Sequence, residues 1–189
     1  CNYPYYFFSC DYNRKDGDII TKYGTGIFSK YPITDSGRHV YFGRKVAESL
    51  AYADVKINND TIRVFNTHLQ SMYLKLQWTP ELQTDDFLND DIAFLKETNN
   101  QYHQRIKRYD ARHTVQAKMI KPILNNCKRP FIFCADLNSV PSSYTYHTIQ
   151  HGLRDAFTAK GFGIGGTYDG FSPTLRIDVV LMSKQFKPV

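Results

Sequence analysis

Alternation of apolar and polar residues over short stretches is the dominant pattern in the first third of the chain, and it predicts β-strands. Residues 49–57 and 61–69 both show the two-residue period of a half-buried strand. The intervening Asn58-Asn59-Asp60 is typical of a turn, so these two segments are predicted to form a hairpin. Further strands are predicted at residues 5–10, 23–30, 39–42, 131–135 and 175–183.

Helical periodicity begins after residue 69 and predicts helices that flank the strands. Residues 102–125 carry an apolar stripe at helical spacing, and Pro122 is expected to kink or end this helix. A second amphipathic stretch covers residues 82–98, inside an excursion at 72–100 that we interpret as a surface insertion with its own helix. A short helix is predicted at residues 142–149. Hairpins together with helices predict an α/β fold with a mixed sheet.

Composition narrows the class of protein without choosing a partner. The 189 residues, with 42% hydrophobic and 22% charged side chains, fit one globular domain. The net charge of +6 favours an anionic partner, but nucleic acid, lipid headgroups and small phosphate esters all remain open. No apolar stretch is long enough to span a bilayer. The four cysteines lack metal-site spacing, and their redox state, like the cellular compartment, stays open.

Three predicted strands end in, or are interrupted by, polar side chains that can carry chemistry. Asp136 and Asn138 follow the apolar run at 131–135 and, being two apart, point the same way on an extended backbone. Asn66 and His68 share a face in the same manner, and Asp178 interrupts the last strand. Side chains of this kind at converging strand ends suit the handling of a phosphate or a metal-bound water.

Each of these positions also has a purely structural interpretation. An Asp-x-Asn after a strand often only hydrogen-bonds its own backbone. A single histidine is often satisfied by a backbone partner, and we interpret His113, on the stripe of the long helix, as a core residue. A carboxylate at 178 within an apolar strand is expected to be buried, so it needs a partner such as Arg176 or a group on a neighbouring strand.

Five segments in their order along the chain carry a family resemblance. They are Gly24-Thr25-Gly26-Ile27-Phe28-Ser29-Lys30, Asn66-Thr67-His68-Leu69, Arg112-x-x-x-Gln116, Cys134-Ala135-Asp136-Leu137-Asn138-Ser139-x-Pro141 and Arg176-Ile177-Asp178-Val179-Val180-Leu181-x-Ser183. From about residue 24 to its end, the chain resembles the endonuclease/exonuclease/phosphatase superfamily. The usual core motif there is Gly-Asp-Phe-Asn. Here alanine and leucine replace the glycine and the phenylalanine, while the polar pair is intact.

The resemblance implies a four-layered α/β sandwich of two mixed sheets and hydrolysis of a phosphate ester by water with a divalent cation, Mg²⁺ or Mn²⁺. It implies that Asp136 orients or deprotonates the water and that Asn138 holds the water or a phosphate oxygen. His68 would donate to the phosphate, and Asp178 would hold the imidazole of a further histidine.

Asn66 and Ser139 are the expected substrate-binding residues. The substrate class stays open among nucleic acid, phospholipid and inositol phosphate. The loops at 72–100 and 161–172 are expected to select it, with Tyr73, Trp78 and Phe87 as stacking candidates.

Three elements of the superfamily pattern have no evident counterpart here. A first strand that bears an asparagine and the glutamate that binds the metal are not found before Gly24, and no Ser-Asp-His run follows the last strand. The metal ligands are therefore unknown. We expect a partial domain truncated at both ends, weak or inactive by itself and prone to self-association through exposed sheet edges. The alternative hypothesis is a non-catalytic binding module on the same scaffold.

Overall fold

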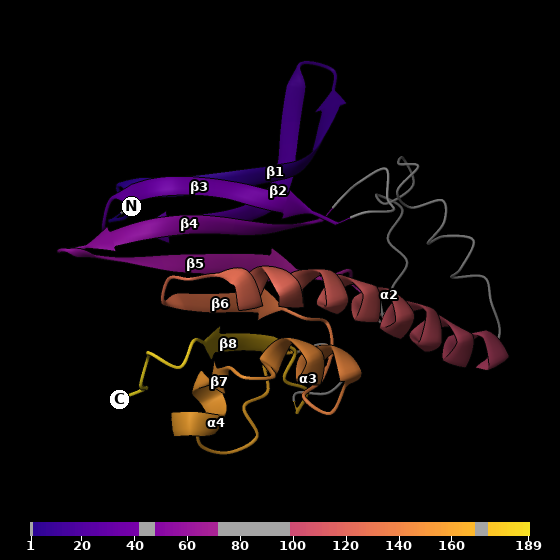
Figure 1. The fold of residues 1–189 in the computed structure, drawn as a ribbon. Helices are drawn as coiled ribbons and strands as arrows, with labels where there is room; N and C mark the ends of the chain where they lie inside the picture. The colour runs from indigo at the N-terminus through magenta and orange to yellow at the C-terminus, as the bar shows by residue number, and fades with distance from the viewer. Residues whose placement is uncertain (1, 42–47, 72–98, 169–173) are drawn as a thin grey trace.

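A computed structural model describes residues 2–41, 48–71, 99–168 and 174–189, and in them the strands form two separate sheets (Figure 1). The strands are β1 (Tyr5–Asp16), β2 (Ile19–Ser29), β3 (Ile33–Val40), β4 (Ser49–Ile57), β5 (Asp60–His68), β6 (Phe131–Asp136), β7 (Arg154–Asp155) and β8 (Asp178–Met182). The helices are α2 (Asn99–Asn126), α3 (Tyr144–Gln150) and α4 (Ala156–Lys160).

The larger sheet is mixed and has the strand order β3-β4-β5-β6-β8-β7. β5 and β6 pair in parallel, and the other neighbours in this sheet pair antiparallel. A parallel pair requires a crossover connection, and α2 lies in the one between β5 and β6. As a result, the carboxyl-terminal ends of β5 and β6 lie at the same edge of the sheet.

α2 and α3 cover one face of the six-stranded sheet and build the main core there. Phe65 and Phe133, on neighbouring strands, are fully buried together with Leu181 of β8. Ile120 of α2 and Ile149 of α3 pack against them and are equally buried. The helical stripe predicted for residues 102–125 therefore faces the sheet, as expected.

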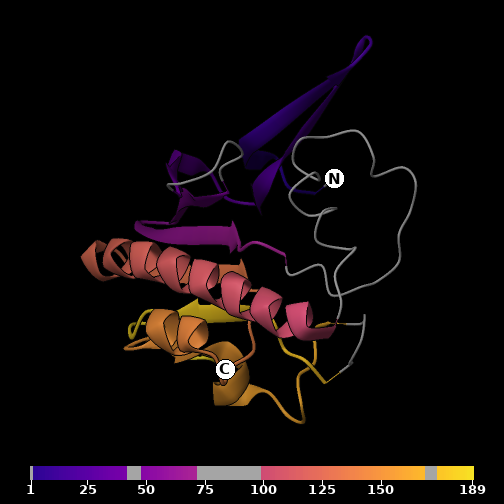
Figure 2. The same ribbon diagram turned by 90° about the vertical axis from the view of Figure 1, so that its right-hand side faces the viewer.

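The smaller sheet is the antiparallel β1–β2 hairpin, which packs on the other face of the larger sheet. Ile27 of β2 contacts Ala51 and Ala53 of β4, and the small side chains let the two sheets approach closely. In Figure 2 the hairpin and α2 lie on opposite sides of β5. Gly24 faces the backbone of Ser9 so closely that a Cβ at this position would lie 1.8 Å from the Ser9 carbonyl oxygen. The backbones of β1 and β2 therefore pass too closely at this position for a residue with a side chain.

Some predicted boundaries were wrong. The strand expected at 39–42 is instead Ile33–Val40, and the strand expected at 175–183 is shortened to Asp178–Met182. Pro122 does not end α2 at its own position, because the helix continues to Asn126 while Leu124 is held in the core. The insertion predicted at 72–100, with its helix at 82–98, lies outside the described residues except for the first two residues of α2.

In the part of the chain that the structure describes, no helix combines the length and the apolar character needed to cross a membrane.

Candidate active site

Three neighbouring strands place His68, Asp136 and Asp178 in one row across the sheet. His68 pairs with Asp136 in the parallel register of β5 and β6, and Asp136 pairs with Asp178 in the antiparallel register of β6 and β8. Residues in register on adjacent strands project from the same face. The row lies at the ends of β5 and β6 and at the start of β8, where the polar side chains reach solvent without crossing the core.

The His68 imidazole lies against the loop that follows β6. Its Nε2 atom is 3.6 Å from Asp136 Oδ2 and 3.1 Å from Asn138 Nδ2. Asn138 Nδ2 also donates to the Leu69 carbonyl at 2.9 Å, which fixes the orientation of the amide because a carbonyl only accepts. The amide therefore donates to His68 Nε2, so in this arrangement the neutral ring carries its proton on Nδ1.

A local turn sets the relation between Asp136 and Asn138. Asn138 has φ of 45°, in the left-handed region that asparagine tolerates better than most residues. Its backbone N–H donates to Asp136 Oδ1 at 2.9 Å. Asp136 therefore does hydrogen-bond the local backbone, as the structural interpretation of the Asp-x-Asn pattern expects. The same turn directs the Asn138 side chain toward His68.

The Asp136 carboxyl lies in an electrostatically unfavourable place for a negative charge. Burial raises its pKa above the ordinary value, and the nearby charge of Asp178 raises it further. The hydrogen bond from the Asn138 backbone and the proximity of His68 act in the opposite direction without cancelling the rise. A positive charge arriving at this carboxylate would therefore be stabilised.

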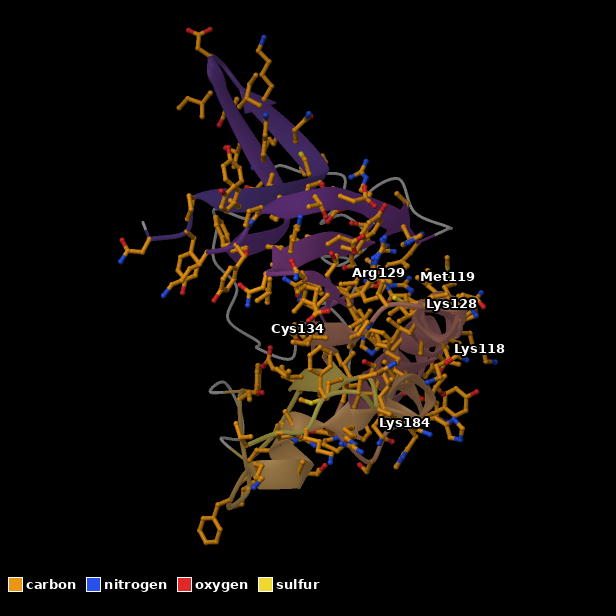
Figure 3. The ribbon with its side chains drawn as sticks, turned by 60° about the vertical axis from the view of Figure 1, so that its left-hand side comes forward. Lys118, Met119, Lys128, Arg129, Cys134 and Lys184 are labelled. Atoms are coloured by element: carbon orange, nitrogen blue, oxygen red, sulfur yellow. The ribbon has the colours of Figure 1, made fainter. Side chains whose placement is uncertain are left out.

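A cleft of about 710 Å³ opens beside this row, between the two sheets. Asn66 lies in its wall, where its Nδ2 donates to the Gly26 carbonyl at 3.1 Å and ties β5 to β2. Cys134 also lines the cleft, on the opposite side of the sheet from Lys118 and Met119 of α2 (Figure 3). The lining residues are Gly24, Thr25, Gly26, Asn66, Thr67, His68, Cys134, Ala135, Asp136, Ala156, Phe157, Gly165, Thr167, Arg176, Asp178, Val179 and Val180.

Ser139, which is predicted to bind substrate, is not among the residues that line the cleft. Only 4% of the residue is exposed, and its hydroxyl lies 2.9 Å from His113 Nδ1 on the helix-covered side of the sheet. The alternation that holds along β6 ends at Asp136, so the loop turns Ser139 away from the cleft. The structure thus places Ser139 behind the site instead of in its wall.

Asp178 is exposed, and the expectation that it would be buried was wrong because β8 begins at this residue. It also does not pair with Arg176. Arg176 Nη1 instead lies 2.8 Å from Asp155 Oδ2, and both side chains are buried.

Two contributors to the cleft escaped the sequence analysis. Thr167 Oγ1 accepts hydrogen bonds from the backbone N–H groups of Ile177 and Asp178, at 3.0 and 3.1 Å, and so fixes the start of β8. Phe157 forms a wall with the guanidinium of Arg176, which lies 5.0 Å from the ring centroid. Neither residue belongs to a periodic pattern or a motif, so no sequence signal distinguishes them.

Within the described residues, no set of three or more histidine, cysteine, aspartate or glutamate side chains converges on one point. The paired carboxylates of Asp136 and Asp178 nevertheless offer the hard oxygen ligands that Mg²⁺ prefers, and Mg²⁺ commonly uses only one or two protein carboxylates. The donor set therefore fits a partly hydrated divalent cation better than a closed structural metal site.

Comparison with known families shows where this arrangement of strand ends belongs. The model of the endonuclease/exonuclease/phosphatase family matches residues 2–189. The chain belongs to this family. The resemblance carried by the five motifs is thereby confirmed. Members are phosphoester hydrolases that typically use a divalent metal.

Solved structures of the family share the fold at low sequence identity. A family protein from Bacteroides thetaiotaomicron is 13% identical with a TM-score of 0.58, covering 94% of this chain and 59% of its own. A mannosyl-6-phosphatase from the same species is 17% identical with a TM-score of 0.52, and the match covers 96% of this chain and 64% of the phosphatase. Sphingomyelinase C from Streptomyces griseocarneus is 16% identical with a TM-score of 0.51, and the match covers 84% of this chain and 52% of the sphingomyelinase. The chain thus spans little more than half to two thirds of their lengths. No curated protein sequence matches it.

Proposed function

We propose that this protein is a metal-dependent hydrolase of phosphate esters that acts at the row formed by His68, Asp136 and Asp178. One observation carries the proposal: His68 Nε2 and Asp136 Oδ2, from strands that α2 separates in sequence, lie 3.6 Å apart at the rim of the cleft. A base and a potential proton donor at this distance suit attack of a water molecule on a bound phosphoryl group.

Asp136 is assigned the task of orienting and deprotonating the attacking water. Its raised pKa makes it a stronger base than an ordinary aspartate. Asn138 is assigned the holding of that water or of a phosphate oxygen. Its backbone turn and its hydrogen bond to Leu69 fix the side chain before substrate arrives.

His68 is assigned the stabilisation of negative charge on the phosphoryl oxygens. Either ring nitrogen of the imidazole can donate a hydrogen bond, depending on which one carries the proton. A hydrogen-bond donor held close to the phosphoryl oxygens stabilises the negative charge that develops on them. Asn66, in the cleft wall, is assigned to substrate binding, whereas the position of Ser139 supports an indirect role.

Asp136 and Asp178 are the residues that would hold the divalent cation. When bound, Mg²⁺ neutralises charge on a phosphate oxygen and lowers the pKa of a coordinated water. Asp178 thereby has two candidate roles. One is to hold the cation, and the other, which stays a prediction, is to orient the imidazole of a further histidine.

The proposal extends to the architecture and the substrate. We propose that the 189 residues are part of one domain whose complete form is the four-layered sandwich. The substrate is taken to be a phosphate ester of nucleic acid, phospholipid or inositol. The mannosyl-6-phosphatase and the sphingomyelinase named above differ in substrate on one fold, so the fold does not choose among these classes.

The experiment measures hydrolysis of bis(p-nitrophenyl) phosphate and p-nitrophenyl phosphate by the full-length protein with Mg²⁺, Mn²⁺ or EDTA. We expect cation-dependent release of nitrophenol, lowered by about 10²- to 10⁴-fold in Asp136→Ala. His68→Gln tests the predicted donor, and Asp18→Asn, in the turn between β1 and β2, is the matched control that should keep full activity. A panel of natural phosphate esters then identifies the substrate class.

Equal rates for the unchanged protein and Asp136→Ala would contradict the proposal. Binding of a phosphate ester without turnover in either form would support the non-catalytic binding module instead.

A further inference from the structure

One buried side chain links the two loops that carry the site. His113 of α2 is 0% exposed, and both of its ring nitrogens have partners. Nε2 lies 2.7 Å from the Gln70 carbonyl oxygen, and Nδ1 lies 2.9 Å from Ser139 Oγ. Gln70 follows His68 by two residues, and Ser139 follows Asn138 directly. A single imidazole thus joins the segment after β5 to the segment after β6.

The chemistry of the partners fixes the state of this ring. A carbonyl oxygen only accepts, so Nε2 must carry a proton and donate it to Gln70. The Ser139 hydroxyl can donate, so Nδ1 is satisfied without a proton and the ring is neutral. Burial lowers the pKa of His113, which is consistent with a ring that stays neutral. The imidazole therefore has one donor and one acceptor, and each meets the group that it requires.

The two loops are also joined directly on the other side of these segments. Leu69 N–H donates to the Asp136 carbonyl at 2.9 Å, and Asn138 Nδ2 donates to the Leu69 carbonyl at 2.9 Å. These two hydrogen bonds join the segments after β5 and β6 next to the row of His68, Asp136 and Asp178. His113 joins the same two segments from the side of α2. The loops are consequently held between the sheet and α2, which fixes the separation of His68 and Asn138.

We propose that His113 is a positioning residue, which holds the His68 and Asn138 loops at their working separation through its neutral Nε2–H tautomer. The expected fall in kcat rests on the proposed function, whereas the expected positions of the two loops do not. Displacement of a catalytic group by about 1 Å can lower a rate by about 10²-fold. Loss of the two hydrogen bonds should therefore lower kcat even though His113 does not touch the substrate.

Substitutions at both ends of the link test this role. His113→Phe keeps an aromatic ring but loses both hydrogen bonds, and we expect a fall in kcat of about 10- to 100-fold with a much smaller change in KM. His113→Gln places an amide donor near the Gln70 carbonyl and should recover part of the loss. Ser139→Ala removes only one bond, and its effect should be smaller than additive with His113→Phe.

A matched control separates positioning from general destabilisation. Leu124→Ala, in the same helix but toward its opposite end, should lower the melting temperature while leaving kcat unchanged at a temperature where all variants are folded. If His113→Phe lowers the melting temperature like Leu124→Ala but also leaves kcat unchanged, the positioning role is wrong.

NMR of the protein labelled with ¹⁵N-histidine supplies a readout that needs no activity. We expect the nitrogen shifts of His113 to report the Nε2–H tautomer, and the signals of His68 to shift in His113→Phe but not in Leu124→Ala. These shifts test the inference even if no phosphate ester is hydrolysed, which would contradict only the proposed function. A protonated or Nδ1–H His113, or an unshifted His68, would overturn the inference.

Discussion

Asp136 and Asp178 face each other across the antiparallel pair of β6 and β8, so two carboxylates share one end of the sheet. Asp136 is partly buried and has a raised pKa, whereas Asp178 is exposed. Placing like charges together is destabilising unless a cation or a substrate uses them. This local cost is typical of sites selected for chemistry instead of stability.

The first prediction concerns stability in metal-free buffer. Because the Asp136 carboxyl has a higher pKa in the folded protein than in the unfolded chain, the folded state binds more protons between the two values. Ionisation of the Asp136 carboxyl therefore lowers the free energy of unfolding as pH rises through the raised pKa. Asp136→Asn should raise the free energy of unfolding at pH 7 by about 0.5–2 kcal/mol. The gain should vanish at pH values below the ordinary carboxyl pKa.

Urea unfolding with EDTA across a pH series measures this effect. Asp18→Asn, at an exposed turn, serves as the control and should change stability little at any pH. A destabilised Asp136→Asn at neutral pH would contradict the prediction.

The second prediction concerns the divalent cation. Ligands that bind only the folded state raise the melting temperature according to their concentration and affinity. Mg²⁺ should therefore raise the melting temperature of the unchanged protein, and the shift should be lost when Asp136 and Asp178 are both replaced by asparagine. The measurement is a thermal titration with Mg²⁺ at constant ionic strength. An equal shift in the double variant would place the cation elsewhere.

The third prediction concerns Thr167, which holds the start of β8. Thr167→Val removes the acceptor of the Ile177 and Asp178 amides and should cost about 0.5–1.5 kcal/mol of stability. Hydrogen exchange at these two amides should accelerate, and the catalytic rate should fall because Asp178 is no longer fixed. Thr167→Ser keeps the hydroxyl and should retain both properties. Unchanged exchange in Thr167→Val would show that the hydroxyl does not fix the strand.

The fourth prediction concerns the buried network around Asp155. Burial by itself would raise the pKa of this carboxyl, but hydrogen bonds from Tyr146, Arg176 and the Thr158 backbone lower it overall. Removing one partner of a buried ion pair leaves the other charge unpaired, so Asp155→Ala should cost about 3–5 kcal/mol. Since the pKa of Asp155 is depressed in the folded protein, its ionised carboxyl stabilises the fold above the ordinary carboxyl pKa. This stabilisation is lost as pH falls through the depressed pKa.

Chemical denaturation of Asp155→Ala, Arg176→Met and the double variant tests the network. The sum of the stability losses of the two single variants should exceed the stability loss of the double variant, because each single variant leaves a charge or acceptor unsatisfied. Simple additivity would contradict the assigned pairing.

Much of the site was predictable because it depends on local geometry. The two-residue period of a strand placed Asn66 and His68 on one face, and the apolar run before Asp136 marked the end of a buried strand. The order of the five motifs was sufficient to indicate the family, which the family comparison confirms. The strand predictions use only relations between residues close in sequence, whereas the family resemblance uses the order of motifs along the chain.

The sequence by itself therefore determined the main secondary-structure segments, the polar strand tips and the family. Only the tertiary structure decided that Asp178 is exposed opposite Asp136, that Arg176 pairs with Asp155, and that Ser139 turns inward to His113. The physical reason is that strand order and register arise from contacts between distant segments. Which polar groups meet depends on those contacts, and the period of each segment does not specify them.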